Sequence, residues 1–249
     1  MFEIGVKSDQ GRVRQINQDA VLVDIGQLEG DEYALLAVAD GMGGHRAGEV
    51  ASQMAIDSFA EQFLLLSNQQ TEPLLALEMA ARRANQQIHR QAESDYRLAG
   101  MGTTLTAAFL WRGQLQAVHV GDSRLYLHRT GNCQQLTDDH SLVGELLKSG
   151  NLSEQEAQQH PRRNVLIRAL GASASVEVDL LVRTLQPDDV VLLCSDGLST
   201  ALSHTELAAL IGSYHHPQQA VDAMVQAANE QGGVDNITAV MARWRWERP

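Results

Sequence analysis

The sequence predicts an α+β fold, a four-layer αββα sandwich in which two central antiparallel β-sheets are flanked by pairs of helices. Strand-like stretches are interrupted by paired helical stretches rather than alternating with single ones, which favours antiparallel sheets over a doubly wound parallel sheet. The chain of 249 residues is long enough to bury a substantial core. Acidic motifs of similar character run from Asp19 to Asp235. We therefore expect a single domain over residues 1–249.

Strands and two long helices are expected in the first part of the chain. Residues 2–8, 21–25 and 33–39 have strand patterns, and the last is a continuous apolar run that suits a strand buried on both faces. From Arg46 the apolar residues step by one, three or four, which is the stripe of an amphipathic helix. A second helix is expected after Pro73. Both stripes are typical of helices that pack on a core.

A strand pair and a helical insert are expected next. Strand character resumes at residues 103–110, and residues 114–120 and 124–128 form a pair joined by the turn Gly-Asp-Ser. Helical patterns then follow, with a glycine stop and a capping box at Ser153-x-x-Glu156. We expect this insert, at about residues 141–165, to form a mobile flap.

The last part of the chain returns to strands and a second pair of helices. Residues 176–185 and 189–194 have strand patterns. A capping box at Ser203-x-x-Glu206 predicts one helix, and Pro217 starts another. Residues 236–244 form the final predicted strand.

Composition excludes several classes of function. The formal charge is −12, from 19 basic and 31 acidic residues, and no basic stripe is present, which argues against nucleic acid or an anionic membrane as a partner. The two cysteines, Cys133 and Cys194, cannot build a disulfide framework, and Cys194 lies in an apolar run. No signal peptide or membrane-spanning stretch is evident. These features predict a cytoplasmic protein.

Four short motifs place an acidic residue where a strand pattern ends. They are VADGMGG with Asp40, VGDSR with Asp122, LLCSDG with Asp196, and Asp235 before an Asn-Ile-Thr stretch. Carboxylates brought close together repel one another unless cations lie among them, and oxygen ligands suit hard divalent ions. The sequence therefore predicts a site for Mg²⁺ or Mn²⁺.

An ordered set of motifs resembles that of the protein phosphatase 2C-like, metal-dependent (PPM) serine/threonine phosphatases, and of their bacterial branch in particular. Each tripeptide alone is weak evidence, but the set occurs in the family's order and spans nearly the whole chain. The motifs are residues 14–19 (RQINQD), 40–45 (DGMGGH), 102–104 (GTT), 121–124 (GDSR), 139–141 (DHS), 168–171 (RALG), 195–197 (SDG) and 235–236 (DN). The resemblance implies the αββα fold and the hydrolysis of phosphoserine and phosphothreonine.

The resemblance also implies a set of metal ligands. Asp40 would bridge two Mn²⁺ or Mg²⁺ ions, the carbonyl of Gly41 would add a neutral ligand, and Asp196 and Asp235 would complete the shell of one ion. Asp122, with Asp196, would form a third and weaker site. A deprotonated water between the two core ions would attack phosphorus directly, without a phosphoenzyme.

Other residues are expected to act around the ions. Arg14 matches the arginine that holds the phosphate, and Asp19 matches the acidic residue that holds metal-bound water. Gln18 stands where many relatives carry glutamate. In animal members a histidine directly follows the Asp-Gly pair, and the nearest candidate for that proton donor here is His45. His140 is expected to brace the flap instead.

These features predict a metal-dependent protein phosphatase that opposes a bacterial serine/threonine kinase. The expected partners are phosphorylated proteins and the cognate kinase, without nucleic acid or membrane, and the chain is expected to be a monomer. Two alternatives stay open: a catalytically silent module of the same fold that binds phosphopeptides or a kinase, and a hydrolase of small phosphate monoesters. Cysteine-based phosphatase, kinase and dehydrogenase chemistry are excluded, because their cysteine-arginine and glycine-loop spacings are absent.

Overall fold

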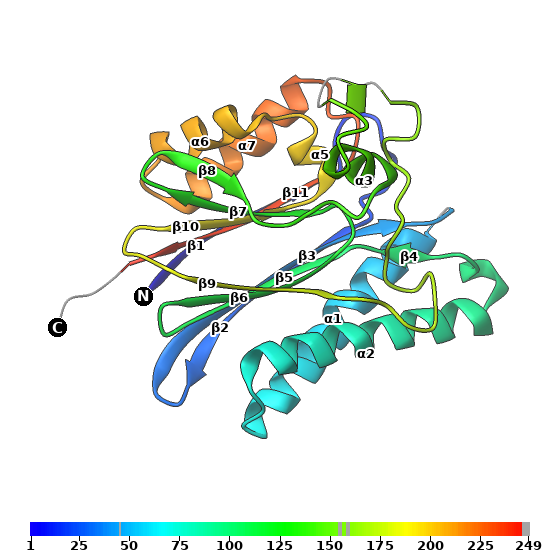
Figure 1. The fold of residues 1–249 in the computed structure, drawn as a ribbon, viewed down its shortest axis with the longest axis horizontal. Coiled ribbons are helices and arrows are strands. Elements are labelled where there is room, and N and C mark those ends of the chain that lie inside the picture. The colour runs from blue at the N-terminus through cyan, green and yellow to red at the C-terminus, as the bar shows by residue number, and fades with distance from the viewer. Residues whose placement is uncertain (45, 154–155, 158–159, 246–249) are drawn as a thin grey trace.

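The computed structural model describes residues 1–44, 46–153, 156–157 and 160–245, and it has the four layers that the sequence predicts (Figure 1). A five-stranded sheet has the order β1-β11-β10-β7-β8, and a six-stranded sheet has the order β2-β3-β5-β6-β9, with β4 paired to β3. All the described pairings are antiparallel. The predicted fold class is therefore confirmed.

The strands of the five-stranded sheet come from both ends and the middle of the chain. They are β1 (Phe2–Asp9), β7 (Arg124–Arg129), β8 (Asn132–Gln135), β10 (Val190–Cys194) and β11 (Ile237–Trp244). The strands of the other sheet are β2 (Asp19–Leu28), β3 (Asp31–Met42), β4 (Gly102–Thr103), β5 (Leu105–Trp111), β6 (Gln114–Val120) and β9 (Asp179–Thr184). The apolar run of β3 is buried from Ala34 to Ala39, as expected for a strand covered on both faces.

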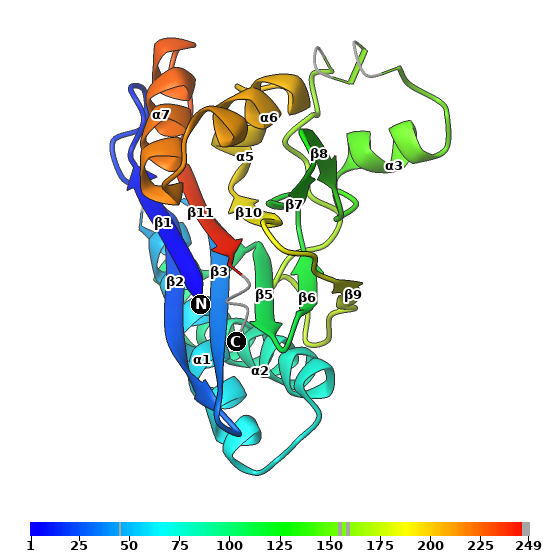
Figure 2. The same ribbon diagram turned by 90° about the vertical axis from the view of Figure 1, so that its left-hand side faces the viewer.

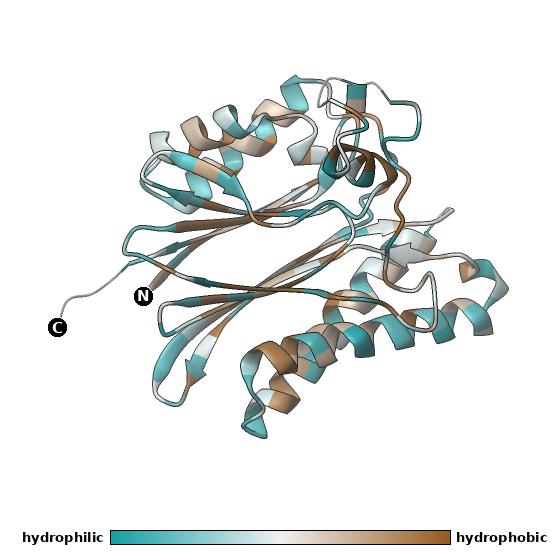
Figure 3. Cartoon of the chain, viewed as in Figure 1, coloured by the Kyte–Doolittle hydropathy of each residue, from teal (hydrophilic) through white to brown (hydrophobic). Residues whose placement is uncertain are grey.

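Each sheet is covered on its outer face by a pair of helices (Figure 2). Helices α1 (Ala47–Asn68) and α2 (Pro73–Ser94) pack on the six-stranded sheet, while α6 (His204–Ser213) and α7 (Pro217–Glu230) pack on the five-stranded sheet. Apolar residues occur along the strands, and both apolar and polar residues occur along the helices (Figure 3). Apolar cores therefore lie between the sheets and under both helix pairs.

Three elements differ from the sequence expectation. Strand β9 begins at Asp179 instead of residue 176, because Val176 and Val178 are buried in the core beneath α2. Strand β8 was not predicted, since only Cys133 of its four residues is buried. A short helix, α5 (Asp196–Ser199), follows β10 where no helix was predicted. None of these differences changes the layer order.

The segment predicted to form a flap begins with α3 (Leu142–Lys148), whose N-cap is Ser141. A 3-10 turn (Tyr96–Leu98) follows α2. The capping box at Ser153 and Glu156 forms as predicted, with the carboxylate accepting from the serine N–H at 2.8 Å. The short helix that it predicts falls partly on residues 154–155 and 158–159, outside the described residues. None of the helices in the described ranges has the length and apolar character needed to cross a bilayer.

The core beneath α1 and α2 contains an aromatic cluster around Phe109, and it gives a test of the packing. The Phe109 ring is 1% exposed and lies 5.0 Å from Phe63 and 5.5 Å from Tyr33, measured between ring centroids. We expect Phe109→Ala to lower the free energy of unfolding by about 3–5 kcal/mol, through lost burial and the cavity left behind.

Urea denaturation of both proteins measures this difference. Leu75→Ala on α2 is the control, because Leu75 is 47% exposed, and its cost should stay below about 1 kcal/mol. Equal losses for the two variants would contradict the packing described for Phe109.

Candidate active site

Two of the predicted acidic residues face each other across neighbouring strands. Asp19 opens β2 and is the register partner of Asp40 in β3. The sequence placed Asp40 just beyond a strand, but β3 continues to Met42, because β4 pairs with its last two residues. The Asp40 N–H donates to Thr104 Oγ1 at 2.8 Å, and the Asp40 carbonyl accepts from the Thr104 N–H at 2.9 Å. The backbone of Asp40 is therefore fixed, while its carboxylate is left to the site.

Asp196 and Asp235 reach the same place from the five-stranded sheet. Asp196 is the first residue of α5, directly after β10, and Asp235 immediately precedes Asn236 and β11. A Cβ at Gly197 would lie 2.0 Å from the Asn236 carbonyl oxygen, so glycine is needed where these two segments touch. The side chains of Asp196 and Asp40 lie within hydrogen-bonding reach of each other. The two sheets thus contribute carboxylates to one cluster.

Asp122 lies in the turn between β6 and β7, beside the same cluster. The turn packs tightly, because a Cβ at Gly121 would lie 2.5 Å from Thr104 Cγ2, and Gly121 has a φ of +113° that favours glycine. The hydroxyls of Thr104 and Ser123 share a hydrogen bond of 2.7 Å. Thr104 therefore links the backbone of Asp40 to the turn that carries Asp122.

The carboxylates of this cluster perturb one another. Burial raises the pKa of Asp19 to about 7, of Asp122 to about 8 and of Asp196 to about 6, and neighbouring acidic side chains add to each increase. Burial raises the pKa of Asp40 well above its usual value, and repulsion from Asp19 and Asp196 adds to that effect. The cluster therefore favours either protons or cations among its oxygens.

The donor set fits divalent cations. Asp19 Oδ1 and Asp196 Oδ1 are buried and have no hydrogen-bond partner in the described part of the chain. Such orphaned anionic oxygens are costly unless a cation or proton meets them. Among the described residues, no three acidic, histidine or cysteine side chains form a group that could by themselves hold a metal ion. Backbone oxygens and water would have to complete any coordination shell.

The carbonyl of Gly41 is the backbone oxygen that the resemblance implies. A Cβ at Gly48, in the first turn of α1, would lie 2.7 Å from this oxygen, so a side chain at position 48 would collide with it. Gly48 was not singled out from the sequence, where it stands as a glycine at a helix start. Its importance depends on a contact between two backbones.

Arg14 lies at the mouth of the cluster. Its Nη2 donates to Asp235 Oδ2 at 2.7 Å, and this ion pair raises the pKa of the arginine. Arg14 also lines a cleft of about 840 Å³, together with Arg46, Arg97 and Asp95. The guanidinium group thus lies between the acidic cluster and a cleft that opens to solvent.

Two polar residues that the sequence analysis gave no role hold this arrangement together. Asn236 Nδ2 donates to the carbonyls of Gln10 and Ile16, and its Oδ1 accepts from the Gln18 N–H, which ties residues 10–18 to the cluster. Ser195 Oγ donates to Asp19 Oδ2 at 2.7 Å. Both residues lie within motifs on which the resemblance rests, so their place in these motifs was the one signal in the sequence that could have identified them.

The structure brings most of the predicted site residues together. Arg14, Asp19, Asp40, Gly41, Asp122, Asp196 and Asp235 all lie at one end of the sandwich, where the loops of both sheets meet. His45 lies outside the described residues. His140 is buried at 4% exposure, next to the turn of Asp122.

The raised pKa values predict a pH dependence of stability without divalent cations. The folded cluster keeps protons that the unfolded chain releases near pH 4, so its contribution to stability is fully present below that pH. We expect the free energy of unfolding in EDTA to fall as pH rises from about 4 to about 8, because the raised pKa values lie at about 6 to 8. Urea denaturation across this pH range measures the effect.

Asp40→Asn should flatten this decline, because it removes one of the repelling charges. Asp57→Asn on α1 is the matched control, since Asp57 is exposed and contacts Gln53 instead of the cluster. Mn²⁺ should raise the unfolding temperature more at pH 8 than at pH 6, because it competes with protons for the same oxygens. If the free energy of unfolding fell with pH at the same slope in wild type and Asp40→Asn, repulsion from Asp40 would not be the cause of the decline.

Comparisons with known proteins agree with this geometry. Residues 10–242 match the family model described as Protein phosphatase 2C. The chain is 43% identical over 240 residues to the "Serine/threonine phosphatase stp" of Listeria welshimeri, which covers 94% of this chain and 93% of that protein.

Solved structures show the same likeness. The phosphatase PstP/Ppp of Mycobacterium tuberculosis has a TM-score of 0.87 and 38% identity, with 98% of this chain and 99% of that chain covered. The catalytic domain of PstP in complex with two manganese ions has a TM-score of 0.84 and 37% identity, with 97% of each chain covered. This chain belongs to the protein phosphatase 2C family of metal-dependent serine/threonine phosphatases.

Proposed function

We propose that this chain removes phosphate from phosphoserine and phosphothreonine in proteins, with two Mn²⁺ or Mg²⁺ ions held in its acidic cluster. One observation supports this most strongly. Separate segments bring their carboxylates to one place, and two of the buried oxygens lack a partner among the described residues. The similar PstP catalytic domain has been solved with two manganese ions.

In this proposal the carboxylates of Asp40, Asp196 and Asp235 and the carbonyl of Gly41 would hold the two ions. Asp122, with Asp196, would hold a third ion more weakly. When bound, the ions would supply Lewis acidity toward the phosphoryl oxygens and would lower the pKa of water enough for it to attack phosphorus directly.

The remaining residues would position the substrate and move protons. Arg14 would leave Asp235 and grip two phosphoryl oxygens with its planar guanidinium, which suits bidentate contacts. Asp19, held by Ser195, would orient water at the cluster. His45 would donate a proton to the leaving alkoxide, since histidine titrates near neutral pH.

The proposal extends to the biological setting. The substrates would be phosphorylated proteins, and the reaction would reverse that of a serine/threonine kinase in the cytoplasm. The chain would act as a monomer and as one domain over residues 1–249, with the flap at about 141–165 adjoining the site. The family relationship and the basic residues of the cleft beside Arg14 support a phosphorylated protein over a small ester.

Asp40→Asn and Asp235→Asn should lower the affinity for Mn²⁺ and reduce turnover by at least about 100-fold, because each removes a proposed ligand charge. Calorimetric titration with Mn²⁺ measures the affinity. Turnover is measured with p-nitrophenyl phosphate, a phosphothreonine peptide and a whole phosphoprotein, each with and without Mn²⁺.

Asp57→Asn is again the control and should behave as wild type. Near-normal rates for Asp40→Asn at limiting Mn²⁺ would overturn the proposed ligand set. A wild-type protein that binds phosphopeptide without turning over any substrate would be a binding module. Turnover of p-nitrophenyl phosphate alone would indicate a small-ester hydrolase.

His45→Gln should slow the hydrolysis of phosphoserine more than that of p-nitrophenyl phosphate. The reason is that a serine alkoxide needs a proton to leave, whereas p-nitrophenolate does not. Comparison of kcat for both substrates in wild type and variant measures the difference. Equal losses on the two substrates would remove His45 as the proton donor.

A further inference from the structure

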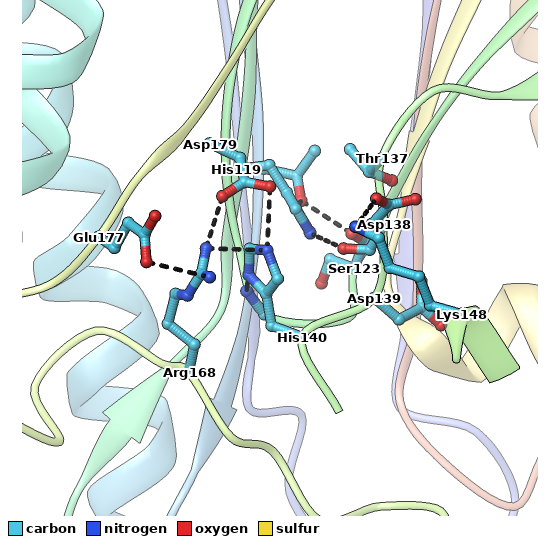
Figure 4. Close-up of polar contacts among 12 residues, drawn as sticks. His119, Ser123, Thr137, Asp138, Asp139, His140, Lys148, Arg168, Glu177 and Asp179 are labelled. Carbon is cyan, nitrogen blue, oxygen red and sulfur yellow. Dashed lines mark hydrogen bonds and ion pairs between the residues drawn. The ribbon is translucent and has the colours of Figure 1, made fainter. Parts of the chain in front are cut away.

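A buried histidine pair, His119 and His140, lies beside the turn that carries Asp122, and Figure 4 shows the two rings with their polar partners. His119 and His140 are 3% and 4% exposed, and their ring centroids are 4.6 Å apart. Neither ring has a role in the proposed reaction. Buried polar rings are normally held by hydrogen bonds, so their partners indicate what they do.

His140 holds Gly121, the residue before Asp122, at two points. The His140 N–H donates to the Gly121 carbonyl at 2.7 Å, and the Gly121 N–H donates to His140 Nδ1 at 3.1 Å. Both backbone polar groups of Gly121 are therefore satisfied by one residue. Any displacement of His140 would move the backbone on which Asp122 is built.

The outer edge of the His140 ring is fixed in turn. His140 Nδ1 accepts from the Gly121 N–H, and Nε2 on the opposite edge lies 3.0 Å from Arg168 Nη1 and 3.2 Å from Asp179 Oδ2. The other oxygen of Asp179 accepts from Arg168 Nη1 at 2.5 Å (Figure 4). Asp179 begins β9, so the ring is oriented by a residue of the six-stranded sheet.

The far side of the turn is held by hydroxyl groups. Thr106 Oγ1 donates to the Ser123 carbonyl at 2.9 Å, and Ser123 Oγ shares a hydrogen bond with Thr104 Oγ1. Gly121 is thus fixed by His140, and Ser123 is fixed by Thr104 and Thr106. Of the three turn residues, Asp122 alone directs its side chain toward the acidic cluster, where it interacts with Asp196.

We propose that His140 is a positioning residue, which holds the Gly121–Asp122 backbone so that the Asp122 carboxylate stays beside Asp196. The bond that matters is the one from the Gly121 N–H to Nδ1, while Asp179 and Arg168 hold the opposite edge of the ring. This inference rests on the proposed function, because it assigns His140 an effect on turnover that passes through Asp122.

Three substitutions of His140 distinguish the role of its Nδ1 edge from that of its Nε2 edge. Asparagine can place its side-chain oxygen near the position of Nδ1, and glutamine can place its amide nitrogen near that of Nε2. We expect His140→Ala and His140→Gln to lower kcat/KM for a phosphothreonine peptide by about 10- to 100-fold, the usual cost of losing a group that orients a metal-site ligand. His140→Asn should retain most of the wild-type value.

A double-mutant cycle tests whether the effect passes through Asp122. In an Asp122→Asn background, His140→Ala should change kcat/KM by less than about twofold, because the group that it positions is already lost. His128→Asn is the matched control, since His128 is also a buried histidine, at 9% exposure, in β7. His128→Asn should change kcat/KM by the same factor in the wild-type and Asp122→Asn backgrounds.

Amide hydrogen exchange at Gly121 gives a readout that needs no turnover. Exchange should be faster than in wild type for His140→Ala and His140→Gln, but not for His140→Asn. The proposal would be overturned by unchanged exchange in all three variants, or by a His140→Asn variant whose turnover is as slow as that of His140→Ala. It would also be overturned if His140→Ala lowered kcat/KM by the same factor in the wild-type and Asp122→Asn backgrounds. If wild type shows no phosphatase activity, the proposed function fails, and exchange still decides whether His140 holds the turn.

Discussion

Repulsion among carboxylates at one end of the sandwich is the constraint on which the rest of this structure depends. Asp19, Asp40, Asp122 and Asp196 all have pKa values above their usual range, through burial and through one another. A chain that brings such groups together without cations must stabilise the arrangement by other means. The scaffold around the cluster supplies them.

That scaffold consists mainly of neutral groups. Thr104 connects the Asp40 backbone to Ser123, Ser195 donates to Asp19, and Asn236 ties down residues 10–18. These hydroxyls and amides hold the Asp40 backbone, the Asp19 carboxylate and residues 10–18, and they add no charge to a crowded site. The apolar layers on both sides then hold the strand ends in place, because α1 and α2 pack on one sheet and α6 and α7 pack on the other. Stability comes from these layers, and the acidic cluster opposes it.

The cationic groups have a more local purpose. Arg14 pairs with Asp235 and so partly neutralises the charge of the cluster. The same side chain faces the cleft that Arg46 and Arg97 also line, although the whole chain carries a charge of −12. Arg124 and Arg168, in contrast, pair with Asp139 and Asp179 and stabilise the segments behind Asp122.

The sequence by itself determined the layer order, the helix pairs and the identity of the acidic residues. Periodicity is local, so the stripes of α1 and α2 and the buried run of β3 could be recognised from their own residues. The motifs at Asp40, Asp122, Asp196 and Asp235 could be recognised because turns and strand ends restrict which residues occur there. Strand β8 and the late start of β9 were missed, since their patterns depend on what covers them.

Only the tertiary structure decided how the site is assembled. The register of β2 and β3 places Asp19 opposite Asp40, and close contacts with segments distant in the sequence require glycine at positions 48, 121 and 197. The ion pair of Arg14 with Asp235 and the two-point contact of His140 with Gly121 join residues that no local pattern relates. Hydrogen bonds and the repulsion between carboxylates depend on distances in space. The packing of the two sheets sets these distances, and the order of residues along the chain does not set them.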